Sequence, residues 1–227
     1  MITQLIIPAA GLGRRLGLQL PKALAMLGNQ SLVARTLNCL LPVEFTEPSI
    51  VIFPKGYEEA FREALSEVPV AIQYIEGGLE RRDSVKRGLD GLNPDTDIVV
   101  IHDAARPFPP LRAVCTAIDA TRQYGAATLA TPVTDTILTD NGTGCLGMTP
   151  DRSLLWSCQT PQVFQVDLIR QAYGDERNTG ISCTDDATLV QRIGSPVKLV
   201  DGGVMNFKVT TKLELAFANY LLEQGLV

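Results

Sequence analysis

The sequence predicts an α/β fold, with a mostly parallel sheet, helices on both of its faces and one projecting β-arm. Short apolar runs rich in branched residues alternate with helical patterns along the chain, and each run ends in Gly, Pro or a polar loop. Helical crossovers make successive strands parallel and cover both faces of their sheet. Only the segment 134–158 breaks the alternation, and it therefore predicts the arm.

The elements follow from these patterns in chain order. Strands are expected where a branched apolar run is bounded by turn residues, at Leu5–Pro8, Ile50–Phe53, Ala71–Ile75, Ile98–His102, Ala127–Thr131, Val197–Val200 and Asn206–Val209. Helices are expected where apolar residues recur at a spacing of three or four, at Ser31–Leu41, Tyr57–Leu65, Asp83–Leu92, Leu111–Tyr124, Asp167–Tyr173, Asp185–Ile193 and Lys212–Gln224. Ser31 is the expected N-cap of the first helix.

The arm contains a hairpin signal, Asp140-Asn141-Gly142, between short strand-like pieces. Short hairpins are marginal unless they pack against something else. One interpretation gives the arm a partner subunit as its support, and the other lays it over the protein's own surface.

Composition excludes several classes of protein. The net charge of −5 argues against general nucleic-acid binding, and the cations are concentrated in segments 11–22 and 81–87, as expected for an anionic small molecule. The five cysteines are odd in number and lack Cys-x-x-Cys spacing, which favours reduced thiols over zinc or disulfides. We find no secretion signal and no apolar run near the ~18 residues of a membrane helix. We therefore expect one cytoplasmic domain over 1–227, without membrane contact.

The most informative segment follows the first strand. From Gly11 to Lys22 it carries three cations, Arg14, Arg15 and Lys22, and no acid. Glycines allow main-chain N–H groups to turn toward a polyanion, and cations of the same loop can meet phosphate oxygens. The loop therefore predicts a cradle for a nucleoside triphosphate.

Other interpretations of this loop remain open. Gly11, Gly13 and Gly17 also suggest a dinucleotide-binding turn, and hence an oxidoreductase, but their spacing is one residue off the commonest form. That turn requires an acid after the second strand, whereas this chain has Pro54-Lys55 there. Two further alternatives are that the glycines serve only to form the turn, and that the protein binds a nucleotide without catalysing a reaction.

Three more segments follow strand ends. Ser84 and nearby N–H groups could meet a base or a phosphate, unless the segment 77–85 is only a solvated first helical turn. Asp103 ends a strand and suits a magnesium ion or a ribose. We assign its neighbour His102, the only histidine, a structural role. Lys208 lies in an apolar run and is either an edge residue or aimed into the site.

Together these segments resemble the family of 2-C-methyl-D-erythritol 4-phosphate cytidylyltransferases. The resemblance extends along the whole chain through ordered motifs: Pro8-Ala9-Ala10-Gly11-x-Gly13-x-Arg15, Pro21-Lys22, Gly77-Gly78, Arg81, Asp83-Ser84-Val85, His102-Asp103-Ala104-Ala105-Arg106-Pro107, Pro132-Val133, Asp135-Thr136, Arg152, Thr160-Pro161-Gln162, Thr184-Asp185 and Lys208-Val209-Thr210.

The resemblance implies a Rossmann-like nucleotidyltransferase fold with a dimerisation arm. It also implies a reaction of CTP with 2-C-methyl-D-erythritol 4-phosphate, in the presence of Mg²⁺, that gives a CDP-alcohol and pyrophosphate. The reaction is an early step of the non-mevalonate route to isoprenoids. Transfer to ribitol 5-phosphate is the close alternative, since related enzymes share the CTP-binding half.

The resemblance also implies roles for individual residues. The catalytic residues would be Arg15, Lys22, Arg152 and Lys208. The nucleotide would be bound by Ala9, Ala10, Gly11, Gly13, Gly78, Ser84, Asp103 and Ala104. The methylerythritol phosphate would be bound by Asp103, Arg106, Thr136, Arg152 and Lys208, and Asp103 is the candidate metal ligand. Thr136 and Arg152 of the arm would reach the site of the neighbouring subunit in a homodimer.

Three positions depart from the family's pattern. Ala23 stands where Gln is usual, Leu79 replaces an acid or polar residue, and Met205 stands where an acid is common. The last weakens the case for a second carboxylate near the metal. None of the three removes a charge that the reaction requires.

Overall fold

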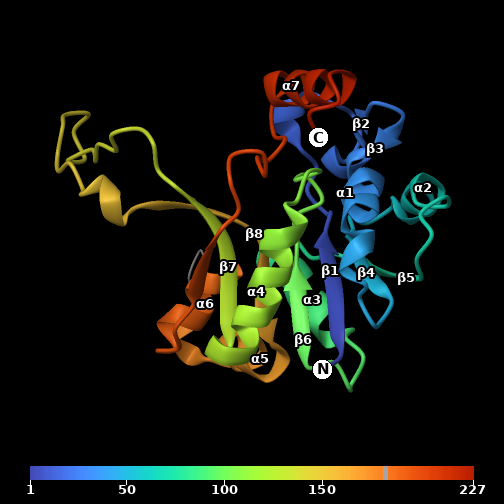
Figure 1. Ribbon diagram of the computed structural model, residues 1–227, viewed down its shortest axis with the longest axis horizontal. Helices are drawn as coiled ribbons and strands as arrows, with labels where there is room; N and C mark the ends of the chain where they lie inside the picture. Colours follow the sequence, from blue (N-terminus) through green and yellow to red (C-terminus); the bar gives the residue numbers. More distant parts are fainter. Residues whose placement is uncertain (181–183) are drawn as a thin grey trace.

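A central sheet of seven strands organises the protein (Figure 1), for which a computed structural model describes residues 1–180 and 184–227. The strand order is β5-β4-β1-β6-β8-β7-β9, and β2 and β3 form a separate antiparallel pair. Within the large sheet only β8 runs antiparallel to its two neighbours. The predicted α/β fold with a mostly parallel sheet is confirmed.

The bounds of the elements agree with the predictions to within a few residues, apart from the exceptions below. The strands are β1 Thr3–Pro8, β2 Met26–Leu27, β3 Gln30–Ser31, β4 Ser49–Phe53, β5 Ile72–Glu76, β6 Ile98–Ile101, β7 Ala126–Pro132, β8 Trp156–Gln165 and β9 Lys198–Asp201. The α-helices are α1 Leu32–Leu40, α2 Glu58–Ala64, α3 Arg81–Asp90, α4 Leu111–Tyr124, α5 Val166–Gly174, α6 Asp186–Arg192 and α7 Lys212–Glu223. The Ser31 hydroxyl accepts a hydrogen bond from the Ala34 N–H, as expected of the N-cap of α1.

Alternate residues of each central strand feed two hydrophobic cores. In β1, Leu5 and Ile7 face one core and Ile6 faces the other. Helices α1, α2 and α4 cover the first face, and α3, α5 and α6 cover the second. Strands buried on both faces need apolar residues at every position, which explains the unbroken runs in the sequence.

The strand predicted at Asn206–Val209 is wrong. This segment pairs irregularly with the loop after β6: the Val209 N–H donates to the Ala105 carbonyl at 2.8 Å, and Phe207 packs against Phe108. Its hydrogen bonds are thus satisfied outside any sheet, although its apolar alternation imitates a strand.

The sequence patterns also missed β8 in the middle of the sheet. Its Gln159-Thr160-Pro161-Gln162 stretch is polar and contains a proline, which disfavours a central strand. These polar side chains are buried because they have partners: the Gln162 Oε1 accepts from the N–H groups of Asp186 and Ala187, at the start of α6. The small β2–β3 pair was also not predicted.

Between β7 and β8 the chain extends away from the sheet (Figure 1). Most of residues 133–155 are exposed, and the expected hairpin turn is reduced to one isolated bridge, between Asp140 and Leu146. The Asp140 carboxylate closes the turn by accepting from the N–H groups of Gly142 and Gly144. Because β8 begins at Trp156, the last residues of the predicted segment belong to the sheet.

The topology gathers the polar loops at one edge. The four parallel strands β1, β4, β5 and β6 end at Pro8, Phe53, Glu76 and Ile101, so the glycine-rich segments and Asp103 follow at the same edge of the sheet. In the described part of the chain, no helix is both long and apolar enough to cross a membrane.

Candidate active site

The loop after β1 folds back on itself so that Lys22 lies against Gly13. A Cβ at Gly13 would lie 2.4 Å from the Lys22 Cβ, and Gly13 has a positive φ of 61°. Both constraints require glycine there. The Lys22 N–H also donates to the Gly11 carbonyl at 3.3 Å. The turn therefore fixes the start of the lysine side chain.

A second loop, after β5, forms the opposite wall. A Cβ at Gly78 would lie 2.2 Å from the Asp83 Cβ, so the close turn depends on glycine. The buried Ser84 hydroxyl accepts from the Gly78 N–H at 3.1 Å and donates to the Glu80 carbonyl at 3.0 Å. Ser84 thus holds the loop in shape, and a Glu80–Asp83 capping box begins α3 directly behind it.

Asp103 follows β6 and is surrounded by cations. Its Oδ2 lies 2.6 Å from the Lys208 Nζ and 3.9 Å from the Arg106 Nε, and its Oδ1 lies 3.6 Å from the Arg81 Nε. Burial acts to raise the pKa of the Asp103 carboxyl, but Lys208 and Arg81 outweigh it and hold that pKa well below its usual range. Asp103 is therefore ionised at neutral pH.

His102 points into the protein and fills a structural role, as predicted. Its Nε2 lies 3.0 Å from the Arg106 carbonyl, and its Nδ1 lies 3.2 Å from the Thr160 hydroxyl, which accepts the Asp103 N–H. Burial lowers the pKa of His102 to about 4. The neutral ring therefore braces the Asp103 loop.

An open cavity lies between the two glycine loops, Asp103 and Lys208. It has an empty volume of about 650 Å³, a figure that includes the open space at its mouth. Predicted site residues that line it are Ala9, Ala10, Gly11, Lys22, Gly78, Ser84, Asp103, Ala104 and Lys208. The structure thus brings together most of the predicted nucleotide-binding residues.

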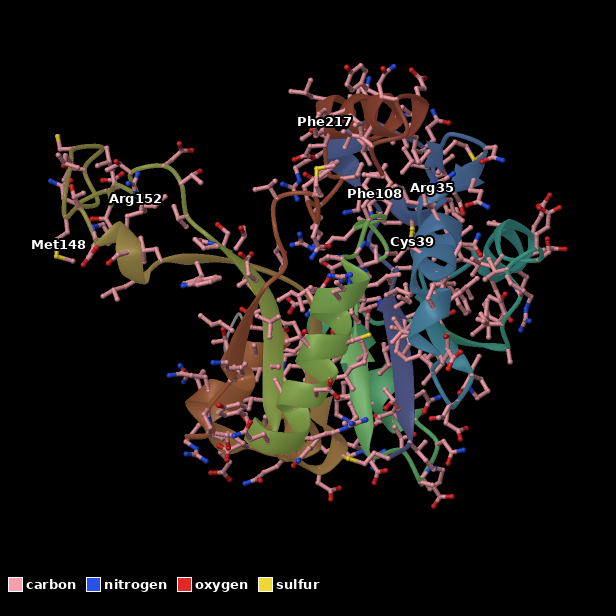
Figure 2. All side chains as sticks on the ribbon, viewed as in Figure 1. Arg35, Cys39, Phe108, Met148, Arg152 and Phe217 are labelled. Carbon is pink, nitrogen blue, oxygen red and sulfur yellow. The ribbon has the colours of Figure 1, made fainter. Side chains whose placement is uncertain are left out.

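Five predicted residues lie outside this lining. Gly13 supports Lys22 from behind. Arg15 is exposed, although its charge is close enough to help lower the pKa of Lys22. Arg106 is turned toward the protein, where it donates to the carbonyl groups of Asn206 and Cys158. Thr136 and Arg152 lie on the arm between β7 and β8, and Figure 2 shows Arg152 well away from the central sheet of its own chain.

The cavity strongly perturbs Lys22. Burial, together with the nearby charge of Lys208, lowers the pKa of the Lys22 ammonium to about 8, although Asp103 opposes the change. A lysine held charged at such a cost gains most when an anion arrives. The cavity is therefore suited to a polyanion.

Sequence reasoning gave no role to three residues beside the cavity. Arg81 lines it and was noted only as part of a motif, while Asp186 and Tyr173 stand behind Arg81. The charge concentration in segment 81–87 was a signal for Arg81. Nothing in the sequence singled out Tyr173, whose position fits an ordinary amphipathic helix.

Two acidic residues, Glu80 and Asp103, border the cavity, and the Glu80 side chain takes part in the capping box of α3. Among the described residues, no three His, Cys, Asp or Glu side chains gather in a way that could hold a metal ion. Mg²⁺ is commonly held by one or two carboxylates together with substrate phosphates. The ionised Asp103 beside the cavity fits that pattern, with the remaining ligands coming from the nucleotide and water.

Comparisons with known proteins agree with one another. The family model described as 2-C-methyl-D-erythritol 4-phosphate cytidylyltransferase matches residues 3–224. Proteins of that name from Desulforamulus reducens and Parasynechococcus marenigrum are 37% and 40% identical to this chain. The first match covers 96% of this chain and 95% of the relative, and the second covers 96% of each.

Solved structures give the same result. The 4-diphosphocytidyl-2C-methyl-D-erythritol synthase of Anaerococcus prevotii superposes with a TM-score of 0.86 at 29% identity, over 98% of both chains. The 2-C-methyl-D-erythritol 4-phosphate cytidylyltransferase of Thermus thermophilus gives 0.81 at 33% identity, over 98% of this chain and 100% of the other.

Proposed function

This chain belongs to the 2-C-methyl-D-erythritol 4-phosphate cytidylyltransferase family, and from that membership we propose how its own residues carry the reaction. It is a nucleotidyltransferase that transfers a cytidylyl group from CTP to 2-C-methyl-D-erythritol 4-phosphate in isoprenoid biosynthesis. The products are 4-diphosphocytidyl-2-C-methyl-D-erythritol and pyrophosphate. The relatives support this activity and give no support to ribitol 5-phosphate as the acceptor.

One observation carries the assignment of roles: Lys22, Lys208 and Asp103 face one cavity beneath two glycine loops. In our proposal the triphosphate lies along the first loop, where Lys22 and the nearby Arg15 hold its oxygens. Ala9, Ala10 and Gly78 leave main-chain groups free to meet the cytosine. The presence of Leu79 in place of an acid or polar residue should change nucleotide binding little, because a contact with its main chain does not depend on the side chain.

The acceptor supplies its own nucleophile. The second pKa of a phosphate monoester is near ~6, so the attacking group is largely a dianion at neutral pH. An oxygen of this phosphate forms a bond to the α-phosphorus of CTP, while the bond to the bridging oxygen breaks and pyrophosphate leaves. No general base is needed, which agrees with a His102 that is buried and neutral.

The protein must bring two polyanions together. Charge grows on the equatorial oxygens of the α-phosphorus and on the leaving pyrophosphate, and preorganised cations stabilise both. Lys22 and Arg15 would serve the triphosphate, while Lys208 holds the attacking phosphate in line. Asp103 would hold Mg²⁺, which when bound neutralises phosphate charge. Arg106 contributes by fixing the backbone beneath Lys208 through Asn206.

We further propose that 1–227 is one domain and that its arm serves a homodimer. Arm side chains such as Leu138, Leu146, Met148 and Leu154 are exposed by 60–77%, which favours a protein surface as their partner. Arg152 is exposed and bonded only to the Thr134 carbonyl of its own arm in the described chain. On this arrangement Thr136 and Arg152 complete the phosphate site of the neighbouring subunit. The free thiols at Cys39, Cys115, Cys145 and Cys158 support a cytoplasmic location.

The direct test is a pyrophosphate-release assay with CTP, Mg²⁺ and one alcohol phosphate at a time. We expect robust turnover with 2-C-methyl-D-erythritol 4-phosphate. Turnover with ribitol 5-phosphate alone would overturn the assignment. A titration with NADPH, followed by its fluorescence, tests the dinucleotide-binding alternative. Saturable binding at micromolar concentration would support that alternative instead.

The pH dependence of kcat/KM for CTP tests Lys22 separately. Its pKa of about 8 in the free protein means that the ammonium is charged below that pH and lost above it. We therefore expect kcat/KM to fall as pH rises through about 8. The free energy of unfolding should respond to pH in the opposite sense. Between about pH 8 and pH 10.5 Lys22 is still protonated in the unfolded chain but has lost its proton in the folded protein. Raising the pH through this range therefore favours folding.

The measurement is a series of initial rates from about pH 6 to about pH 9.5 at limiting CTP. Lys22→Arg is the control, because a guanidinium stays charged across this range and should remove the alkaline limb. An unchanged limb in that variant would assign the titration to another group.

A further inference from the structure

A partly buried series of hydrogen bonds leads from Tyr173 on α5 through Asp186 to Arg81 at the edge of the cavity. The Tyr173 hydroxyl donates to the Asp186 Oδ1 at 2.6 Å, and the Asp186 Oδ2 accepts from the Arg81 Nη2 at 2.9 Å. The Arg81 Nε then lies 3.6 Å from the Asp103 Oδ1. Of these four residues, Arg81 and Asp103 line the cavity, whereas Asp186 and Tyr173 do not.

Asp186 and Tyr173 are held in place by residues of neighbouring elements. The Asp186 N–H donates to the Gln162 Oε1 of β8 at 2.8 Å, which fixes α6 to the sheet. The Arg82 guanidinium lies 5.8 Å from the centre of the Tyr173 ring. Asp186 is 1% exposed, so the carboxylate has little access to water and depends on its two partners.

The charges identify what this arrangement does. Burial acts to lower the pKa of the Arg81 guanidinium, but Asp186 and Asp103 outweigh it and raise that pKa. The Asp186 carboxylate is therefore the nearer counter-charge of Arg81, at 2.9 Å, and less of the arginine's charge is directed at Asp103. This leaves the second oxygen of Asp103 to Lys208 at 2.6 Å, against 3.6 Å for Arg81.

We propose that Asp186 and Tyr173 are positioning residues for cytidylyl transfer, which fix the Arg81 guanidinium on one oxygen of Asp103 and so leave the other oxygen and Lys208 for the reactants. The inference rests on the proposed function, because it presumes that Asp103 and Lys208 meet the substrates. Neither Asp186 nor Tyr173 touches the substrate in this account. Both act through Arg81.

The test is a double-mutant cycle with Asp186→Asn and Tyr173→Phe. We expect Asp186→Asn to lower kcat by about 10- to 100-fold, as for other groups that orient a functional residue. The Kd of CTP should change by less than about 3-fold, because binding uses the glycine loops. Tyr173→Phe should lower kcat by about 3- to 10-fold. The double variant should resemble Asp186→Asn alone, since the hydroxyl acts through that carboxylate.

Asp175→Asn and Tyr124→Phe are matched controls. Asp175, like Asp186, pairs with an arginine, Arg177, and Tyr124 lies at the exposed end of α4, but neither borders the cavity. Their kcat should stay within about 2-fold of the wild type. Melting temperatures of all variants show whether each one folds, and Tyr173→Phe, which removes one atom, remains informative if Asp186→Asn does not.

A purely structural ion pair gives a different result: lower melting temperatures with kcat unchanged, or additive effects in the double variant. Either result would overturn the inference. If the wild type itself fails to turn over CTP and methylerythritol phosphate, the proposed function fails instead. The crystal structure of Asp186→Asn then decides the positioning role, because an unmoved Arg81–Asp103 contact would contradict it.

Discussion

Lys22→Ala is expected to lower kcat/KM for CTP by at least ~100-fold, equivalent to about 3 kcal/mol of transition-state stabilisation. The ammonium is largely buried, lines the cavity and has its pKa lowered to about 8, so it gains most from a phosphate partner. Initial rates at limiting CTP measure the loss. Lys22→Arg should recover part of it, since the charge returns without the compact geometry of an ammonium.

The same substitution should leave the fold almost unchanged. Removing Lys22 removes the cost of burying an ammonium and also the packing of its stem against Gly13, and these two effects oppose one another. Lys86→Ala is the matched control, because Lys86 is exposed on α3 and pairs only with Asp90. A Lys22→Ala protein that melts normally and keeps a kcat/KM near the wild type would show that the loop does not hold the triphosphate.

The parallel half of the fold could be predicted because its signals are local. Strand β6, for example, is buried on both faces and appears as an unbroken apolar run. Strand β8 could not be found in this way, because its buried Gln162 is satisfied by the first N–H groups of α6, a partner distant in sequence. The strand prediction for Asn206–Val209 failed for the opposite reason. This segment has a strand-like pattern, but its apolar residues pack against the Ala105 loop and Phe108 outside any sheet.

The candidate site shows the same division. Lys22 was predicted from the cation-rich loop that follows β1, and Gly78 and Asp103 were predicted from their positions just after β5 and β6 at the carboxyl edge of the sheet. Arg81, Asp186 and Tyr173 come from three different helices, and only the packing of α3 against α5 and α6 brings them together. Because each helix contributes only one residue to this series of hydrogen bonds, no regular spacing in the sequence could indicate it. Arg15 was expected to face the triphosphate beside Lys22. It lies near Lys22 but does not line the cavity.

Mixing Lys22→Ala subunits with Arg152→Ala subunits is expected to restore activity that neither variant has alone. If Arg152 serves the neighbouring cavity, a mixed dimer contains one site with an intact Lys22 and an intact Arg152, and one site lacking both. One of the two sites in each mixed dimer is then intact, so the isolated mixed dimers should recover about half of the wild-type activity. The variants carry different tags, are coexpressed, and the mixed dimers are isolated before their rates are measured.

Lys22→Ala mixed with Arg15→Ala is the control for this restoration. Both residues belong to the loop of one subunit, so every cavity in that mixture lacks one of them and activity should stay low. If Arg152 instead folded back to its own cavity, the first mixture would also stay at the level of the separate variants. A protein that sediments as a monomer at micromolar concentration with full activity would equally contradict the shared site. The arm favours a site shared between subunits, because Figure 2 shows Arg152 well away from the central sheet of its own chain.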